Sequence, residues 1–169
     1  MKAERDEQFH QFVVSRRAHL LRTATLLTAG DAHLAEDLVQ STLTKLYVAW
    51  PSYRGADNPD GYVRRVMVNA LTDERRRWWR RRERSMAEIP DRPAVERSAD
   101  EASEGLRAAL KDLPPRMRAA VVFRYFYDLD VADTADALGC SEGTVKSQTA
   151  RALEKLRAAL GRHTSPVLN

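Results

Sequence analysis

The sequence has few of the features that are typical of exported or membrane-embedded proteins. It contains one cysteine, Cys140, so no disulfide framework can form within the chain. No apolar run approaches the length that spans a membrane. The first residues, MKAERDEQFHQF, are charged and lack the apolar core of a signal peptide. These absences predict a cytoplasmic protein with no membrane insertion.

Motifs that would support catalysis or hold a cofactor are also absent from the sequence. It has no Gly-rich phosphate loop, no HExxH motif and no nucleophile elbow. Its four histidines are scattered without the spacing of metal ligands: His10, His19, His33 and His163. Cys140 falls in a predicted turn, where a half-buried thiol is favoured over a metal ligand. We therefore expect no enzyme activity, no metal and no cofactor.

Positive charge is concentrated in one segment of the chain. The net charge is +4, but residues 61–84 carry 9 Arg against Asp73, Glu74 and Glu83. Such a block indicates a polyanion as partner. The alternative is a solvated Arg-rich face, although like charges this dense weaken a helix unless something neutralises them. Trp78 and Trp79 interrupt the Arg run, and aromatic rings between Arg side chains suit stacking on bases. Covering the core is an equally favoured interpretation for either Trp.

The stretch DVADTADALGCSEGTVKSQTARALEKLRAAL, residues 130–160, predicts two helices joined by a tight turn. Gly139 ends the first helix, and Ser141 is a good N-cap for the second. The spacing of Ala135, Gly139 and Val145 is that of a helix-turn-helix. Val145, Leu153, Leu156 and Leu160 form the inward stripe of the second helix. Polar and cationic side chains face outward, which favours DNA binding over a hairpin that only packs. They are Thr144, Lys146, Ser147, Gln148 and Arg151.

The rest of the chain predicts an all-α fold made of two small helical domains joined by a flexible linker. Apolar periodicity predicts helices over 4–29, 32–49, 104–111 and the segment after Pro115. Pro and Gly predict a loop over residues 51–58, and Asn58 with Pro59 then begins a helix that continues into the Arg block. In the helix after Pro115, the side chains expected in the core are Met117, Val121, Val122, Tyr125 and Phe126. Residues 89–103 have two Pro and no apolar period, which is typical of a linker.

Three stretches in this order resemble bacterial sigma factors of the extracytoplasmic-function (ECF) group, and within it the actinobacterial SigE-like family. They are HLAEDLVQSTLTKLYVAW, DGYVRRVMVNA with the later Trp and Arg run, and LPPRMRAAVVFRYF followed by ALGCSEGTVKSQTARALEKLR. The resemblance implies a sigma region 2 over 1–88, a linker over 89–103, a sigma region 4 over 104–162 and a tail over 163–169. It also implies an alternative sigma factor that binds core RNA polymerase and directs promoter-specific initiation.

The resemblance assigns roles to particular positions. At the -35 element it places Glu142, Gly143, Thr144, Lys146, Ser147, Gln148 and Arg151. For binding and melting of the -10 element it places Tyr53, Arg54, Gly55, Arg65 and Asn69, with Arg76, Arg77 and Trp78 from the Arg block. At the clamp of the β′ subunit it places Asp37, Leu38 and Gln40, while region 4 would dock on the β flap. An anti-sigma factor is a further candidate partner. The first helix of the helix-turn-helix departs from the family in carrying Asp130, Asp133 and Asp136.

Two other classes of function remain as alternatives. A stand-alone helix-turn-helix regulator would bind an operator through residues 130–160, but it would have no need of the Arg and Trp block. An enzyme acting on nucleic acid would need clustered carboxylates or metal ligands, which the sequence does not show.

Overall fold

The computed structural model describes residues 1–84 and 101–163, apart from the side chains of 78–79, 82–84, 101–103 and 162–163. Every regular element in the described ranges is a helix. The chain divides into two compact units, Met1–Pro90 (unit 1) and Asp91–Asn169 (unit 2). The predicted all-α fold with two helical domains is confirmed. Most of the expected linker lies outside the described residues.

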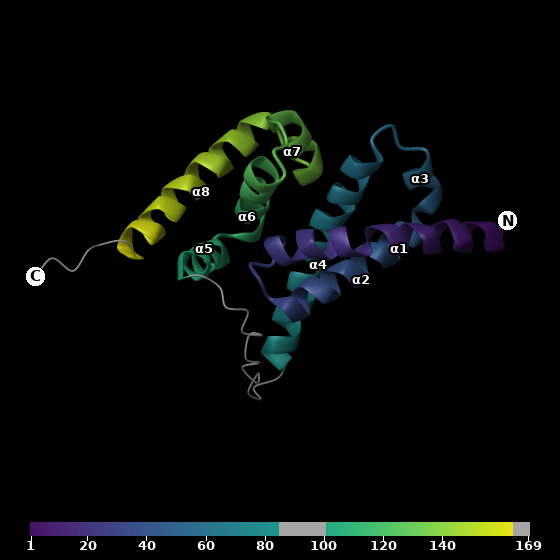
Figure 1. The fold of residues 1–169 in the computed structure, drawn as a ribbon, viewed down its shortest axis with the longest axis horizontal. Helices are drawn as coiled ribbons and strands as arrows, with labels where there is room; N and C mark the ends of the chain where they lie inside the picture. The colour runs from purple at the N-terminus through teal and green to yellow at the C-terminus, as the bar shows by residue number, and fades with distance from the viewer. Residues whose placement is uncertain (85–100, 164–169) are drawn as a thin grey trace, which may run out of the picture. The chain divides into compact units, whose positions relative to one another are not determined.

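The described part of unit 1 consists of four helices, with α2 at the centre. They are α1 (Lys2–Leu27), α2 (Ala32–Val48), α3 (Trp50–Arg54) and α4 (Pro59–Arg84). α2 is the central helix, since it packs against both α1 and α4 (Figure 1). Its side chains Leu38 and Leu46 are fully buried, and Met67 of α4 is 1% exposed. Burial of this apolar stripe, at about 25 cal/mol per Å², is the main source of stability for the unit.

The ends of the helices in unit 1 are set by local side-chain chemistry. The Asp31 carboxylate accepts a hydrogen bond from the Leu34 N–H at 3.0 Å and so caps α2. Gly30 has a φ of +84°, a conformation that glycine adopts without a Cβ penalty. The Asn58 side-chain oxygen accepts from the Gly61 N–H at 3.0 Å and caps α4. Both caps confirm the sequence predictions.

The loop predicted over residues 51–58 is wrong in its first half, because Trp50–Arg54 forms the short helix α3. Pro51 lies in the first turn of α3, where the N–H that proline lacks would have no helical partner. Trp50 is 4% exposed and anchors the helix against the core. Tyr53 and Arg54 therefore project from a helix, and Gly55 caps its C-terminus.

Unit 2 is arranged around its last helix. Its elements are α5 (Glu101–Lys111), α6 (Pro115–Val121), the π-helical turn η1 (Val122–Phe126), α7 (Val131–Leu138) and α8 (Glu142–His163). α8 packs against α5, α6 and α7 (Figure 1). α5 begins at Glu101, inside the range expected for the linker.

The turn between α7 and α8 has the predicted construction. Asp130 caps α7 by accepting from the Asp133 N–H at 2.7 Å. Gly139 has a φ of +63° and reverses the chain after α7. The Ser141 hydroxyl then accepts from the Thr144 N–H at 3.1 Å and caps α8. These three contacts make the helix-turn-helix geometry a local property of the sequence.

The prediction that Tyr125 and Phe126 belong to the core is wrong. Their exposed fractions are 54% and 47%, whereas Phe123 is fully buried. The cause is η1, in which the Tyr127 N–H donates to the Val122 carbonyl five residues earlier. A π turn contains one residue more than an α turn, so the apolar stripe that begins in α6 is shifted around the helix.

The junction of α5 and α6 depends on one buried arginine. Arg118 is 8% exposed. Its Nε donates to the carbonyl of Leu110 at 2.7 Å, and its Nη2 donates to those of Lys111 at 3.1 Å and Leu113 at 2.9 Å. These carbonyls lie at the C-terminal end of α5 and just beyond it, where the last helical C=O groups have no partner within the helix. The positive charge also complements the helix dipole there.

Replacing Arg118 with Met should destabilise unit 2, because buried carbonyls lose their donors at about 1–3 kcal/mol. Hydrogen exchange in the full chain should then become faster in α5 and α6, with unit 1 unchanged. Arg107→Met is the matched control, because Arg107 is exposed on α5. Equal exchange rates in the Arg118→Met and Arg107→Met variants would contradict this account.

Candidate nucleic-acid interface

The beginning of α8 presents a polar face to solvent. Its orientation is fixed by Val145, Thr149, Ala152 and Leu156, which are 0–8% exposed. The opposite face carries the exposed residues Glu142, Gly143, Thr144, Lys146, Ser147 and Arg151. Gln148 is half-buried and lies at the edge of this face. The structure thus brings six of the seven residues predicted for the -35 element to one exposed surface, with Gln148 beside it.

Hydroxyl groups on this face have defined hydrogen-bonding capacity. The Ser147 hydroxyl donates to the carbonyl of Thr144 at 3.0 Å. The hydroxyls of Ser141 and Thr144 bond each other at 2.9 Å. Because the proton of Ser147 is engaged, its oxygen is suited to accept from an external donor. Amino groups of cytosine and adenine in the major groove are donors of this kind.

Gly143 has no structural reason to be glycine. Among the described residues, a Cβ at this position would meet only the Ser141 hydroxyl oxygen, 3.9 Å away. A glycine inside a helix costs about 0.5–1 kcal/mol relative to alanine. Its presence in the first turn of α8 therefore favours close approach of a ligand to the backbone, where helix N–H groups attract anions.

Negative charge on α7 limits where phosphates can bind on unit 2. Asp133 and Asp136 are exposed on α7, and Glu142 is exposed at the start of α8. In a helix-turn-helix the first helix crosses the DNA backbone. These carboxylates would repel phosphates, so Lys146 and Arg151 are left as the cations at the beginning of α8.

In unit 1 the outward face of α4 carries a second polar surface. Arg65, Asn69, Thr72 and Arg76 are all exposed, and we call them the α4 stripe. Their spacings of four, three and four residues place them on one side of the helix. The opposite side is buried, with Val63, Met67, Ala70 and Leu71 at 0–6% exposure. Three predicted -10 residues thus share one face, while the side chain of Trp78 lies outside the described residues.

Arg77 does not belong to this stripe. Its Nη1 lies 3.3 Å from Oε1 of Glu74, a carboxylate that is 4% exposed as a residue and also accepts from the Ser41 hydroxyl of α2. One position earlier, Asp73 accepts from Lys45 Nζ at 2.8 Å, and this hydrogen bond lowers the pKa of Asp73. These contacts pin the middle of α4 to α2. The sequence did not predict this role of Glu74, because acidic residues inside a basic run indicate only that part of the positive charge is neutralised.

The predicted -10 residues of α3 lie beside a cluster of aromatic rings. Tyr53 is half-buried, with its ring stacked on Trp50 at 4.8 Å between centroids and edge-on to Phe12 at 5.2 Å. Arg54 donates to the Gln8 side chain at 2.9 Å. The full cluster is Phe9, Phe12, Tyr47, Trp50, Tyr53 and Tyr62. It holds Tyr53 in place and presents one part of its ring to solvent.

The predicted polymerase contacts on α2 do not form one surface. Gln40 is exposed, and Asp37 is half-buried with its Oδ2 3.7 Å from His33 Nε2. Leu38 is fully buried in the core of unit 1. Its side chain cannot contact a partner directly. Of the three predicted residues, only Asp37 and Gln40 are accessible to polymerase.

The described residues contain neither a membrane-spanning helix nor a cluster of metal ligands. No helix there is long and apolar enough to cross a membrane. Nor do the described residues bring three or more His, Cys, Asp or Glu side chains together to hold a metal ion. Cys140 is half-buried, as expected.

Comparison with known proteins identifies both units. Residues 12–81 match the family model of sigma-70 region 2, and residues 103–156 match that of sigma-70 region 4. The chain is 38% identical to the RNA polymerase sigma-E factor of Streptomyces coelicolor, over 90% of this chain and 86% of that protein. It is 34% identical to the ECF RNA polymerase sigma factor SigM of Mycobacterium tuberculosis, over 86% of this chain and 72% of that protein.

A solved structure has the same fold. It is the sigma factor RpoE in complex with the anti-sigma factor NepR from Bartonella quintana, with a TM-score of 0.71 and 26% identity. The match covers 92% of this chain and 98% of that one. Sequence, region order and fold agree, and the chain belongs to the ECF group of RNA polymerase sigma factors.

Proposed function

We propose that this protein binds core RNA polymerase and directs it to promoters, with α8 reading the -35 element and the α4 stripe acting on the -10 element. The observation that carries this proposal is the pair of exposed polar faces on α8 and α4. Each is held in place by a buried stripe on the opposite side of its helix. Each face alone offers few contacts to DNA, so specific binding requires both faces on one polymerase-bound protein.

Within this proposal the two units have separate tasks. Asp37 and Gln40 of unit 1 contact the β′ clamp, and unit 2 docks on the β flap. On α8, Lys146 and Arg151 are five residues apart and so point about 140° away from each other around the axis. One of them reads a base and the other grips phosphate. On unit 1, Arg65 and Asn69 hold the non-template strand of the melted -10 element. Tyr53, Arg54 and Gly55 lie near a base of that element that is flipped out of the duplex.

The alternative of a stand-alone helix-turn-helix regulator is not supported. The relatives are RNA polymerase sigma factors, and they match unit 1 as well as unit 2. We infer that the protein is a non-catalytic initiation factor and that it acts in the cytoplasm. The Bartonella quintana sigma factor is bound to an anti-sigma factor in its structure, which supports an anti-sigma factor as a partner here.

Replacing Asn69 with Ala should lower open-complex formation without weakening the binding of core polymerase, because Asn69 is exposed on α4 and the proposed polymerase contacts lie on α2. On a template with a pre-melted -10 bubble, transcription by this variant should return to the wild-type level. Gln11→Ala removes a similar amide from an exposed position on α1 and serves as the control. A bubble that fails to rescue the Asn69 variant would show that this assignment is wrong.

Replacing Gly143 with Ala should change stability and DNA binding in opposite directions. The substitution should raise the free energy of unfolding of unit 2 by up to about 1 kcal/mol, because alanine is the better helix former. It should also weaken holoenzyme binding to promoters with a -35 element, because the new methyl group holds the DNA away from the backbone.

Gly161→Ala is the control for this experiment, because Gly161 lies in the same helix and a Cβ added there would meet no side chain of the described residues within 4 Å. Thermal unfolding and promoter binding by the reconstituted holoenzyme would be measured for both variants. If the Gly143 variant binds promoters as tightly as the Gly161 variant, the glycine does not mark the contact with DNA.

A further inference from the structure

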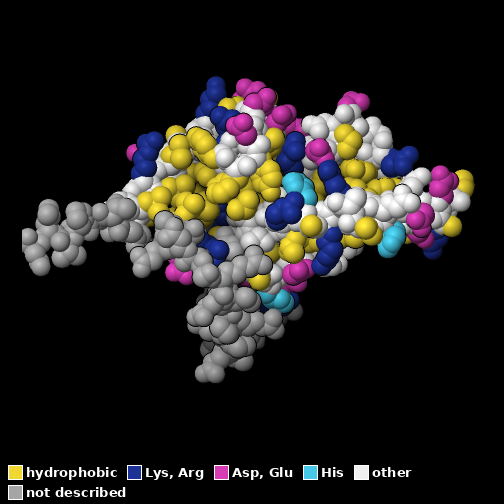
Figure 2. Space-filling model, in the orientation of Figure 1, with side chains coloured by type: hydrophobic (Ala, Val, Ile, Leu, Met, Phe, Trp, Pro, Cys, Tyr) yellow, Lys and Arg dark blue, Asp and Glu magenta, His cyan; other side chains and the backbone are white. Residues whose placement is uncertain are grey.

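A group of basic side chains lies between α1 and the beginning of α4, and none of them belongs to the surfaces described above. Arg16, His19 and Arg22 follow one another at three-residue spacing on α1, and Arg64 projects from α4. We call these four residues the α1–α4 cationic cluster. Arg16 also pairs with Asp60 in the first turn of α4, which ties the two helices together. On the face drawn in Figure 2, Lys and Arg side chains are scattered among acidic and hydrophobic side chains.

The cluster carries more positive charge than its surroundings neutralise. Three guanidinium groups and one carboxylate, Asp60, act on His19, and Asp60 is already paired with Arg16. Burial lowers the pKa of His19, and the charges of Arg16, Arg22 and Arg64 lower it further against the opposing effect of Asp60. Among the charges that act on His19, three are positive and one is negative. Nε of Arg64 is buried and has no hydrogen-bond partner among the described residues.

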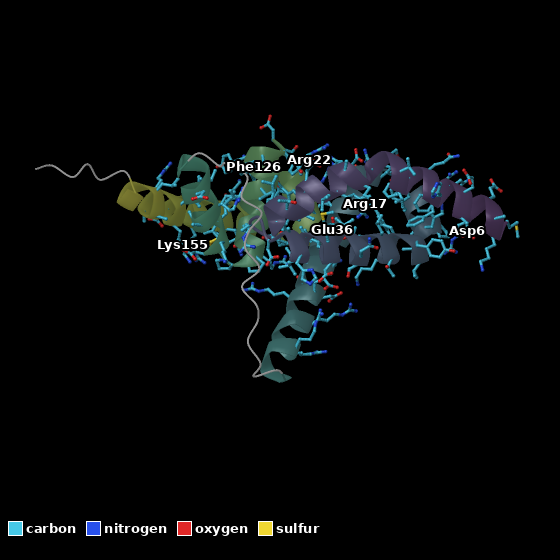
Figure 3. The ribbon with its side chains drawn as sticks, turned by 60° about the horizontal axis from the view of Figure 1, so that its bottom comes forward. Asp6, Arg17, Arg22, Glu36, Phe126 and Lys155 are labelled. Carbon is cyan, nitrogen blue, oxygen red and sulfur yellow. The ribbon has the colours of Figure 1, made fainter. Side chains whose placement is uncertain are left out.

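Arg17 lies on the same helix as Arg22, but its charge is neutralised by a carboxylate. Its Nη2 lies 3.0 Å from Oε2 of Glu36 on α2. In Figure 3, Arg17 and Glu36 lie together on one side of α1, and Arg22 lies on the other side. Arg22 is exposed, and no carboxylate of the described residues pairs with it. The two arginines therefore share a helix and a charge but differ in their electrostatic surroundings.

We propose that the α1–α4 cationic cluster binds the phosphate backbone of promoter DNA next to the segment held by the α4 stripe. Arg64 and Arg65 are consecutive, so their side chains diverge by about 100° from the same turn of α4. A DNA strand that is bound to the α4 stripe would therefore pass close to the α1–α4 cationic cluster. Guanidinium groups pair well with phosphate oxygens because their donors match the geometry of the anion.

The composition of the surface favours phosphate over an acidic protein segment. Protein interfaces have an apolar or aromatic centre surrounded by polar groups. The exposed large hydrophobic side chains of the described residues are Met1, Val14, Val48, Tyr125 and Phe126, and none of them belongs to the cluster. A surface that offers only guanidinium and imidazole groups is best suited to bind the phosphate backbone of DNA. This inference rests on the proposed function, since it requires DNA on unit 1.

The test compares Arg22→Gln with Arg17→Gln in holoenzyme reconstituted from the full chain and core polymerase. Arg22→Gln should weaken binding to every promoter several-fold and reduce the slope of log K against log[salt] by about 0.7–0.9, the value for one lost phosphate contact. Arg17→Gln should leave the slope unchanged. Arg22→Lys retains the charge and should recover most of the binding. The affinity for core polymerase should be the same for all three variants.

A crosslink identifies what the cluster touches. A photo-crosslinking amino acid introduced in place of Arg22 should label promoter DNA in the open complex. Labelling of a polymerase subunit with a matching loss of core affinity would overturn the proposal in favour of an acidic protein surface. An unchanged salt slope for Arg22→Gln would overturn it as well. In either case, wild-type holoenzyme that still initiates transcription would leave the proposed function standing.

Discussion

Burial of one face of a helix decides which side chains on its other face can meet a partner, and both proposed DNA surfaces depend on this constraint. On α8, the fully buried Val145 and Ala152 turn Gly143, Ser147 and Arg151 outward. On α4, an equivalent buried stripe turns the α4 stripe outward. Neither surface contains a loop that must be ordered before it can bind. The recognition geometry is thus fixed by the same apolar contacts that stabilise each unit.

Charge is distributed unevenly around α4. The side toward α2 contains ion pairs and hydrogen bonds that hold the helix, and the exposed side carries the α4 stripe. On the side toward α2, Asp73 and Glu74 accept from Lys45, Ser41 and Arg77, so positive charge there is used to hold the helix in place. The α4 stripe has no comparable acidic partners among its own members. Neutralisation on one side therefore relieves the repulsion within the Arg run, while the opposite side keeps its charge available for the proposed contact with DNA.

The sequence was sufficient wherever local chemistry decides the structure. Caps such as Asp31 and Ser141 could be predicted, because a short polar side chain before an amphipathic helix can accept a hydrogen bond from the free N–H groups of the first turn. The π turn η1 could not be predicted, since periodicity assumes a constant number of residues per turn, and the error placed Phe126 in the core. For α3, the Pro and Gly content suggested a loop, but burial of Trp50 stabilises one helical turn. Leu38 was assigned to a partner surface although its place in the apolar stripe already indicated burial.

The central claim is that this chain gives core RNA polymerase its choice of promoter, and run-off transcription tests it most directly. Purified core polymerase would be supplied with this protein and with genomic fragments from its host. The account predicts discrete transcripts that require both the protein and core polymerase, together with little specific DNA binding by the protein alone. Tight, specific binding by the isolated protein with no transcript from the reconstituted enzyme would contradict it.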